Sequence, residues 1–550
     1  MNRKTKHLAV LLLGLLLINV FNQNFYKRFD LTQDQRYTLS DATKTILEKV
    51  KSRMFIHVYL EGEFPSEFKR LQIETRQYLE ELKAQNSQLK IRFIHPDGKR
   101  DQLIQSGMYP SQLTVQENGK LSNAIIFPWV EFIYGKKREL VSLLPNGVVQ
   151  SQEQQLAVAI ENLEYAFSNA INNITKTRDH KIAVLKGNGE LNDMYLVSLL
   201  SEVKKKYRLT PVSLDTVASN PKKALSTLQS SDLVVVAKPT EPFTAEEKLV
   251  LDQFIMHGGK SLWMFENVQA DTDSLYNDGK MLAYPRDLNL TDMLFSYGVR
   301  VNTALVQDLY AAKIRLATGN MGNQPQFQNL PWFYHPSITG NPQHPISRNL
   351  PPIRLQFANQ IDTLKNDIKK TPLLVSSPLT RKIGTPNFVD LQSIAQEPLQ
   401  EQYQGGYQLF GVLLEGNFNS MYANRIKPFN LKNFKEKSDS NKMIIISDGD
   451  IAKNQIVKNQ PYDLSIDKWT GEQFGNKEFL LNSIDYLLDN TGLIHLRNKT
   501  LQINLLDKKR AYKERSYWQV LNVAAPLAVL LAFGLGFFFW RKKKYSSKTI

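Results

Sequence analysis

The 550-residue chain contains no cysteine. Disulfide bonds, thiolate metal sites, cysteine nucleophiles and a lipid-modified N-terminal cysteine are therefore excluded. The eight histidines are scattered and form no H-x-x-x-H or H-E-x-x-H pattern, and the serines form no G-x-S-x-G elbow. We therefore expect no catalytic residue, no metal site and no bound cofactor.

The composition is that of a folded protein, with 42% hydrophobic and 22% charged residues. The length suggests two or three domains. The net charge is +16, and eleven of these charges lie beside two apolar segments, near residues 3–6, 507–515 and 541–548. This distribution indicates a membrane partner and argues against nucleic acid.

Residues 517–540 form the clearest apolar segment, because the 23 residues from Trp518 to Trp540 carry no charge. About 20 such residues cross a bilayer as a helix, and aromatic residues at both ends suit the membrane interface. We therefore expect a transmembrane helix there, followed by a basic tail over residues 541–550.

A second apolar segment lies near the N-terminus, over residues 8–26. It is either an uncleaved transmembrane anchor or a signal peptide, and the lack of small residues at a cleavage site favours the anchor. The basic residues before it predict a cytoplasmic N-terminus over residues 1–7. Two spans then return the C-terminus to the cytoplasm of an inner membrane and leave residues 27–515 in the periplasm.

A first α/β domain is predicted over residues 27–150. Alternating apolar residues from Met54 to Leu60, and again from Leu89, predict two strands, and residues 66–85 between them have helical spacing. Strand, helix and parallel strand form a βαβ unit, and residues 124–144 predict a hairpin after it. The order resembles a thioredoxin-like domain, here without the C-x-x-C motif that redox chemistry requires.

A single helix from Gln152 to Thr175 is predicted within a linking segment, residues 151–180. Strands alternating with helices over residues 181–495 then predict a doubly wound, flavodoxin-like parallel sheet. A long insertion is expected around residues 267–440, and residues 496–516 are expected to be a juxtamembrane segment. Within and beside the insertion, residues 316–352 are expected to be a loop and residues 430–442 a polar linker.

The stretch HGGKS at residues 257–261 has the ending of a phosphate-binding loop. The full motif needs a glycine five places before Gly259, where this chain has Phe254. The order of elements is also reversed, because a helix precedes the glycines and a strand follows them. We therefore interpret Gly258 and Gly259 as the end of a helix, not as an ATP site.

Two turns after expected strands carry the candidate ligand or partner contacts. Asn188 and Glu190 lie in KGNGE, where an incomplete G-x-G pattern is either a tight turn or part of a ligand crevice beyond the strand ends. Asp448 and Asp450 lie in SDGD, which is either a solvated loop or a site for a divalent cation.

Several longer stretches resemble the gliding-motility-associated ABC transporter auxiliary component family of Bacteroidetes, the GldG family. Among them are "RFDLTQDQRYTLSDAT", "IENLEYAFSNAI", "SDGDIAKNQI" and "GNKEFLLNSIDYLLDNTGLIHLR". The resemblance extends over nearly the whole chain. One departure is Asn188, where the family pattern has histidine in G-H-G-E.

The resemblance implies a subunit that works with a separate ABC ATPase and a permease in gliding motility, linked to secretion machinery. It also implies an amidotransferase-like second domain, whose cysteine nucleophile this chain lacks. Our first hypothesis is therefore a non-enzymatic auxiliary subunit whose periplasmic part couples to or binds a partner. The alternatives are a periplasmic solute- or glycan-binding module and a periplasmic hydrolase.

Overall fold

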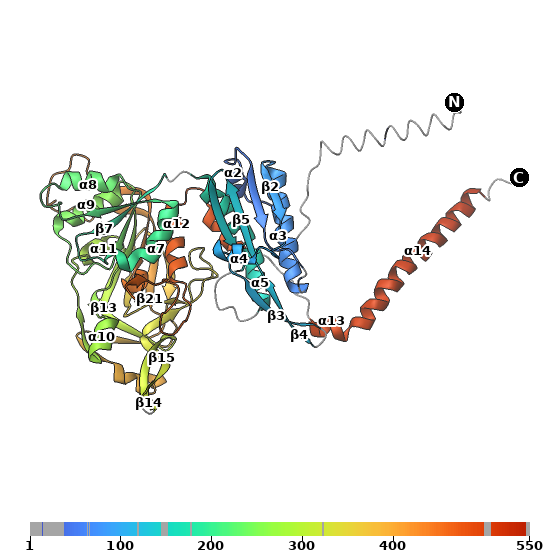
Figure 1. Cartoon of the computed structure of the whole chain (residues 1–550). Helices are drawn as coiled ribbons and strands as arrows, with labels where there is room; N and C mark the ends of the chain where they lie inside the picture. Colours follow the sequence, from blue (N-terminus) through green and yellow to red (C-terminus); the bar gives the residue numbers. More distant parts are fainter. Residues whose placement is uncertain are drawn as a thin grey trace. The chain divides into compact units, whose positions relative to one another are not determined.

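A computed structural model describes residue 14, residues 38–499 and residues 508–545, apart from 63, 65, 118–119, 145–151, 177–178 and 322–323. The contacts within it divide the chain into two compact units, Met1–Thr500 and Leu501–Ile550. The described part of the first unit is a mixed α/β structure with several sheets (Figure 1). The described part of the second unit is helical.

The first sheet lies in the N-terminal part of the first unit. Its strands, in spatial order, are β2 (Leu89–Phe93), β1 (Met54–Val58), β5 (Trp129–Tyr134) and β6 (Lys137–Ser142). β1 and β2 run parallel and α3 (Ser66–Gln85) connects them, whereas β5 and β6 form an antiparallel hairpin beside β1. The alternation in β1 buries Met54, Ile56 and Val58. The predicted strands, helix and hairpin of this region are confirmed.

The helix predicted from Gln152 to Thr175 is wrong as a single element. The structure has α5 (Gln152–Glu161) and α6 (Leu163–Thr175), separated at Asn162. α5 packs against α3, whereas α6 packs against β5, β6 and α2 (Asp41–Leu47). The two helices thus pack against different elements of the unit.

The central sheet has seven strands. In spatial order they are β18 (Lys369–Val375), β21 (Leu409–Asn419), β22 (Lys437–Ile446), β10 (Lys260–Met264), β9 (Leu233–Ala237), β7 (Lys181–Lys186) and β8 (Arg208–Ser213). The five from β22 to β8 are parallel, and β21 and β18 extend one edge in antiparallel fashion. Helices pack on both faces and bury inner strands such as β9 completely, whereas β8 at the edge of the sheet is largely exposed.

One face of the central sheet packs against α8 (Pro221–Gln229) and α9 (Ala245–Met256), which also contact each other. On the other side α12 (Asn476–Leu488) contacts both β10 and α7 (Asp193–Lys206). α9 begins with a capping box, in which Thr244 accepts from the Glu247 amide and Glu247 accepts from the Thr244 amide. The predicted alternation of strands and helices in this part of the chain is therefore confirmed.

The segment between β10 and β22 folds into small sheets with an apolar core of its own, which includes Trp332, Tyr334 and Phe357. Its longest strands, β14 (Ala311–Met321) and β15 (Gln324–Ile338), form a hairpin, and Figure 1 shows this hairpin together with β13 and α10 at one end of the unit. The elements that precede the hairpin are β11 (Val268–Gln269), α10 (Thr272–Asp278), β12 (Lys280–Pro285), α11 (Thr291–Ser296) and β13 (Val299–Asp308). Those that follow it are β16 (Ile353–Arg354), β17 (Asn359–Thr363), β19 (Thr380–Gly384) and β20 (Asn387–Asp390).

Two expectations about the insertion are wrong. Much of residues 316–352 lies in a hairpin of β14 (Ala311–Met321) and β15 (Gln324–Ile338), not in a loop. The described outer half of β15 is exposed and therefore polar in composition. Its pairing with β14 is made through the backbone, so the side-chain pattern gives no sign of a strand. Likewise β22 begins at Lys437, inside the segment expected to be a linker, because its outer half pairs with β21.

The glycine pair that follows α9 ends that helix. Gly258 has φ +96°, and the Lys260 ammonium group donates to the Gly258 carbonyl at 2.9 Å. A Cβ at Gly259 would overlap the buried ring of Phe254. The interpretation of this stretch as a helix end is confirmed, and the lysine of the apparent phosphate motif is bonded to its own turn.

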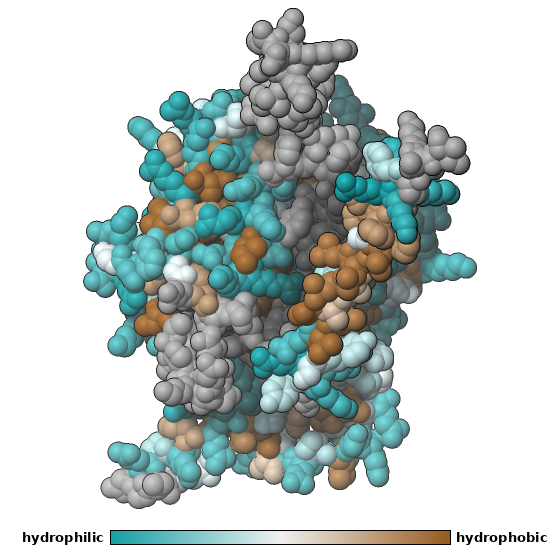
Figure 2. All heavy atoms as spheres, turned by 90° about the vertical axis from the view of Figure 1, so that its right-hand side faces the viewer, coloured by the Kyte–Doolittle hydropathy of each residue, from teal (hydrophilic) through white to brown (hydrophobic). Residues whose placement is uncertain are grey.

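The second unit contains α13 (Lys508–Lys513) and α14 (Arg515–Tyr545). Among the described residues, α14 is the one helix that is long and apolar enough to cross a membrane. Figure 2 shows its apolar side chains as a brown stretch, and Leu531 and Phe533 on it are 68% and 72% exposed. The expected N-terminal span, residues 8–26, lies outside the described residues apart from residue 14.

We expect Gly259→Ala to destabilise the first unit by about 1–3 kcal/mol, because the added methyl group meets the Phe254 ring in a close-packed core. A lower midpoint of thermal unfolding would reveal the change. Gly384→Ala in β19 is the matched control, because a Cβ there meets nothing within 4 Å. Equal midpoints for the two variants would contradict the packing role of Gly259.

Candidate functional site at the carboxyl end of the central sheet

The carboxyl ends of β7, β9, β10 and β22 lie next to one another, because these strands are parallel neighbours in the central sheet. Four turns therefore meet along one edge of the sheet. They contain both pairs of candidate residues from the sequence and several charged residues between them. This is also the edge at which doubly wound sheets hold ligands.

The turn after β7 is bonded within itself and to its neighbours. The Asn188 amide donates to Glu190 at 2.9 Å, and the Asn188 side chain donates to Glu247 at 3.0 Å. The Asn188 carbonyl accepts from the amides of Thr240 and Glu241. Burial raises the pKa of Glu190, although the Asn188 amide opposes the shift. Asn188 and Glu190 therefore brace a tight turn against the loop that follows β9.

The turn after β22 is buried, so its interpretation as a solvated loop is wrong. Asp448 is fully buried, and its two oxygens accept from the amides of Gln356 and Asp450, each at 2.7 Å. Burial, together with the Asp450 and Glu266 carboxylates, raises the pKa of Asp448 well above its usual range. The insertion covers this edge of the sheet, and for that reason the two aspartates are not solvated.

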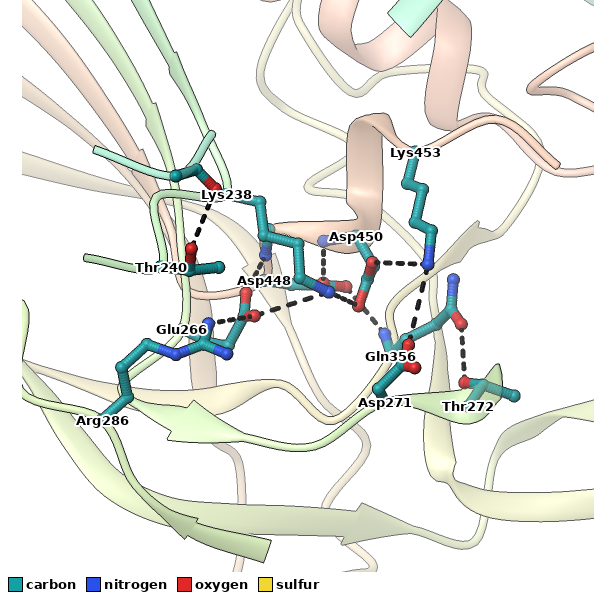
Figure 3. A network of polar contacts seen from close by, with 12 residues as sticks. Lys238, Thr240, Glu266, Asp271, Thr272, Arg286, Gln356, Asp448, Asp450 and Lys453 are labelled. Carbon is teal, nitrogen blue, oxygen red and sulfur yellow. Dashed lines mark hydrogen bonds and ion pairs between the residues drawn. The ribbon is translucent and has the colours of Figure 1, made fainter. Parts of the chain in front are cut away.

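Asp450 belongs to a buried network of opposite charges, shown in Figure 3. The Lys238 ammonium group lies 2.5 Å from Asp450 and 3.6 Å from Glu266. Glu266 also accepts from Arg286 at 3.0 Å and from the Gly449 amide at 2.7 Å. Residues from three neighbouring strand ends thus compensate one another's charge.

The protonation states follow from this arrangement. Burial on its own would raise the pKa of Asp450, but the Lys238 ammonium group outweighs it and lowers that pKa. Burial likewise opposes the charge of Lys238, yet Asp450 and Glu266 raise its pKa above the ordinary value for lysine. Lys238 and Asp450 therefore remain an ion pair near neutral pH.

The structure does not bring the two candidate pairs into direct contact, because β9 and β10 lie between them. The loop after β9 connects them instead. Its Thr240 amide bonds to Asn188, and its Lys238 side chain bonds to Asp450. The four candidate residues thus belong to one bonded edge of the sheet.

Sequence reasoning missed Lys238, Glu266, Arg286 and Lys453. The signal for the first two is visible, because each charged residue follows directly, or within one residue, after an apolar strand. Arg286 and Lys453 carry no such signal, since they reach the cluster only through the fold. Lys453 lies 3.3 Å from Asp273 and 3.9 Å from Asp450.

The chemistry of this edge is that of charge compensation. The ammonium group of Lys238 occupies the position where a divalent cation would neutralise Asp450 and Glu266. Among the described residues, no group of three or more acidic or histidine side chains is arranged to hold a metal ion. The bonds from the Gln356 amide to Asp448 and from Arg286 to Glu266 join the insertion to the sheet at this edge.

The fold and this edge together define a mixed α/β protein with a charge-compensated site and, in the part of the chain that the structure describes, one candidate membrane helix. The chain belongs to the family described as an ABC-type uncharacterized transport system, whose profile matches residues 179–483. It is an auxiliary component of an ABC-type transport system. Residues 33–133 match a second family, described as a domain of unknown function.

One relative is an uncharacterised protein of Borreliella burgdorferi, 20% identical over 539 residues that cover 94% of each chain. A solved structure, the mmIFT52 N-terminal domain, is 14% identical and aligns with a TM-score of 0.31. That alignment covers 59% of this chain and 100% of the other. The transport assignment depends on the family match.

We expect Lys238→Met to destabilise the protein by about 3–5 kcal/mol, because it leaves Asp450 and Glu266 buried without their ammonium partner. Thermal unfolding measures the change. The double variant Lys238→Met with Asp450→Asn should recover part of the loss, because one buried charge is then removed.

Lys280→Met is the matched control for this prediction. Lys280 is an exposed lysine whose ammonium group lies 3.4 Å from Asp390, and such surface pairs contribute about 0–1 kcal/mol. If the Lys238 variant melted at the same temperature as the Lys280 variant, the network would not be stabilising.

Proposed function

We propose that the chain is a non-enzymatic auxiliary subunit of a membrane ABC transporter that works beside a separate ATPase and a permease subunit. The observation that carries this proposal is the family match over residues 179–483. The candidate edge supports the non-enzymatic part, because its carboxylates are bonded to Lys238, to Arg286 and to backbone amides. ATP hydrolysis then takes place in a partner chain.

The proposed location is the inner membrane, with two spans, both termini in the cytoplasm and the bulk of the chain in the periplasm. The exposed apolar surface of α14 supports a membrane position, since about 25 cal/mol per Å² is gained when lipid covers such surface. Basic residues 541–544 after the helix support a cytoplasmic C-terminus.

We also propose the domain division expected from the sequence, with domains at 27–150 and 181–495 joined by residues 151–180. The strand order β2-β1-β5-β6 and the antiparallel β5 support a thioredoxin-like first domain. The order β8-β7-β9-β10-β22 is 2-1-3-4-5 in chain sequence, which is typical of flavodoxin-like sheets.

A role in gliding motility is the finest level of the proposal. The resemblance of the stretches quoted above supports it. Basic residues lie on both sides of the span, in α13 and at residues 541–544. Partners in gliding or secretion would contact the periplasmic part of the chain.

The spacing of small residues in α14 supports the proposed contact with a permease subunit. Small residues recur at every fourth position, and such residues let two membrane helices approach closely. These residues are Ala524, Ala528, Ala532 and Gly536. Residues four apart share one face of a helix, so this face suits packing against another span.

We expect the full chain, tagged and extracted from native membranes, to copurify with an ABC ATPase and a permease subunit, identified by mass spectrometry. Ala532→Leu should reduce recovery of the permease several-fold, because it adds bulk on the small-residue face. Leu530→Phe adds bulk elsewhere on the helix and serves as the control. Purified chain that hydrolyses ATP alone, or copurifies with neither subunit, would contradict the proposal.

Topology has its own test. Alkaline phosphatase is active only outside the cytoplasm, so a fusion after residue 150 should be active and a fusion after residue 545 should be inactive. An inactive fusion after residue 150, with the fusion protein present at normal abundance, would overturn the periplasmic location.

A further inference from the structure

A cavity of about 700 Å³ opens beside the charged edge of the central sheet. Its lining comes from α10, from the β14–β15 hairpin, from the first turn of α7 and from the segments 453–456 and 467–469. Two of its lining residues, Gln356 and Lys453, also contact the aspartates of the turn after β22. The volume lies within the range of about 300–1,000 Å³ that is typical of small-ligand sites.

Exposed aromatic side chains gather at this cavity. Trp469, Phe327 and Tyr276 line it and are 53%, 50% and 38% exposed. Large rings that keep this much exposed surface around one cavity offer flat apolar platforms to a ligand. A ligand with flat apolar faces would cover them.

Three of the five cations that line the cavity lie beside a carboxylate. Lys313 lies 3.2 Å from Glu472, Arg354 lies 2.5 Å from Asp467, and Lys453 lies 3.3 Å from Asp273. The two other cations of the lining, Arg315 and Lys468, lie over the rings of Phe327 and Trp469, each 4.9 Å from the ring centroid. Each cation thus has a carboxylate or a ring beside it in the wall, and the cavity does not require an anionic ligand. Its polar lining equally disfavours a purely apolar one.

One chain of hydrogen bonds in the cavity wall leaves the amide donors of Gln356 and a buried acceptor of His335 without a partner among the described residues. The Thr272 hydroxyl donates to the Gln356 side-chain oxygen at 3.1 Å, and Figure 3 shows this contact. Thr272 must then accept from Nε2 of His335, 3.3 Å away. Nδ1 of His335 is left as a lone-pair acceptor and has no hydrogen-bond partner among the described residues.

The state of His335 is consistent with this assignment. The residue is 3% exposed, and burial, with Arg354 nearby, lowers its pKa to about 3. The ring is therefore neutral at physiological pH. The Gln356 amide group beside it keeps its N–H donors. A ligand hydroxyl group donates one hydrogen bond and accepts another. It therefore matches the Nδ1 acceptor of His335 and the amide donors of Gln356, two residues that both bond to Thr272.

We propose that this cavity binds a short saccharide, whose C–H faces stack on Trp469 and Tyr276 and whose hydroxyl groups bond to Gln356 and His335. Alternating apolar faces and hydroxyl groups are the property that separates saccharides from peptides and from phosphate-bearing ligands. The inference goes beyond the transporter proposal and does not depend on it, because it rests on the cavity alone.

The test uses the full chain in lipid nanodiscs, since a maltoside detergent would itself present a sugar. Isothermal titration calorimetry measures binding of maltotriose, cellotriose and triacetylchitotriose, with tripolyphosphate and a triaspartate peptide as probes of the other classes. We expect at least one trisaccharide to bind with a Kd below about 1 mM. Trp469→Ala should weaken that binding about tenfold or more, because a stacking platform is lost.

Thr272→Val is the second variant, because it keeps the side-chain shape and removes the hydroxyl that orients His335 and Gln356. It should weaken binding several-fold while the melting temperature stays close to that of the parent. Phe388→Ala is the control, since Phe388 is 69% exposed and lies outside the cavity lining.

Three results would overturn the proposal: no trisaccharide binds, only tripolyphosphate or the peptide binds, or sugar binding is unchanged in both Trp469→Ala and Thr272→Val. None of these results bears on copurification with transporter subunits, so the two proposals fail separately.

Discussion

The buried ammonium group of Lys238 is the contact on which the carboxyl end of the central sheet depends. Parallel packing brings the ends of β9, β10 and β22 together, and two of them contribute carboxylates to a region without solvent. Without a cation between them, Asp450 and Glu266 would repel each other in a medium of low polarity. Lys238, from the strand end beside β10, lies within 4 Å of both carboxylates. The parallel arrangement and this ion pair are therefore mutually dependent.

The same cluster attaches the insertion to the sheet. Asp448 accepts from the Gln356 amide, and Glu266 accepts from Arg286, so the insertion supplies donors to carboxylates at the sheet edge. A second attachment lies at α9, where Asp252 accepts from Tyr297 at 2.9 Å and from Ser420 at 2.6 Å. Burial raises the pKa of Asp252, and these donors oppose that shift. With the insertion held at two places, one wall of the adjacent cavity is fixed relative to the other.

Elements with strong local periodicity were predictable. α3 appears with the bounds that its spacing predicts, and the capping box of α9 is formed by Thr244 and Glu247. The β14–β15 hairpin and the outer half of β22 were not predictable, because these strands pair through their backbones while solvent surrounds their polar side chains. The candidate residues lie at the expected strand ends. Their partner Lys238 was missed, although a lysine that follows five buried apolar residues carries a visible signal.

The sequence by itself determined the strongly periodic elements such as α3, the apolar segment of α14 and the failure of HGGKS as a phosphate loop, since each of these depends on residues a few positions apart. Only the tertiary structure decided which charges meet and where a cavity opens. Lys238 and Asp450 are 212 positions apart, and Thr272 and Gln356 are 84 positions apart. The physical reason is that hydrophobic spacing acts within one helix turn or one strand. Charge compensation and cavity lining depend instead on which strands become neighbours when the sheet assembles.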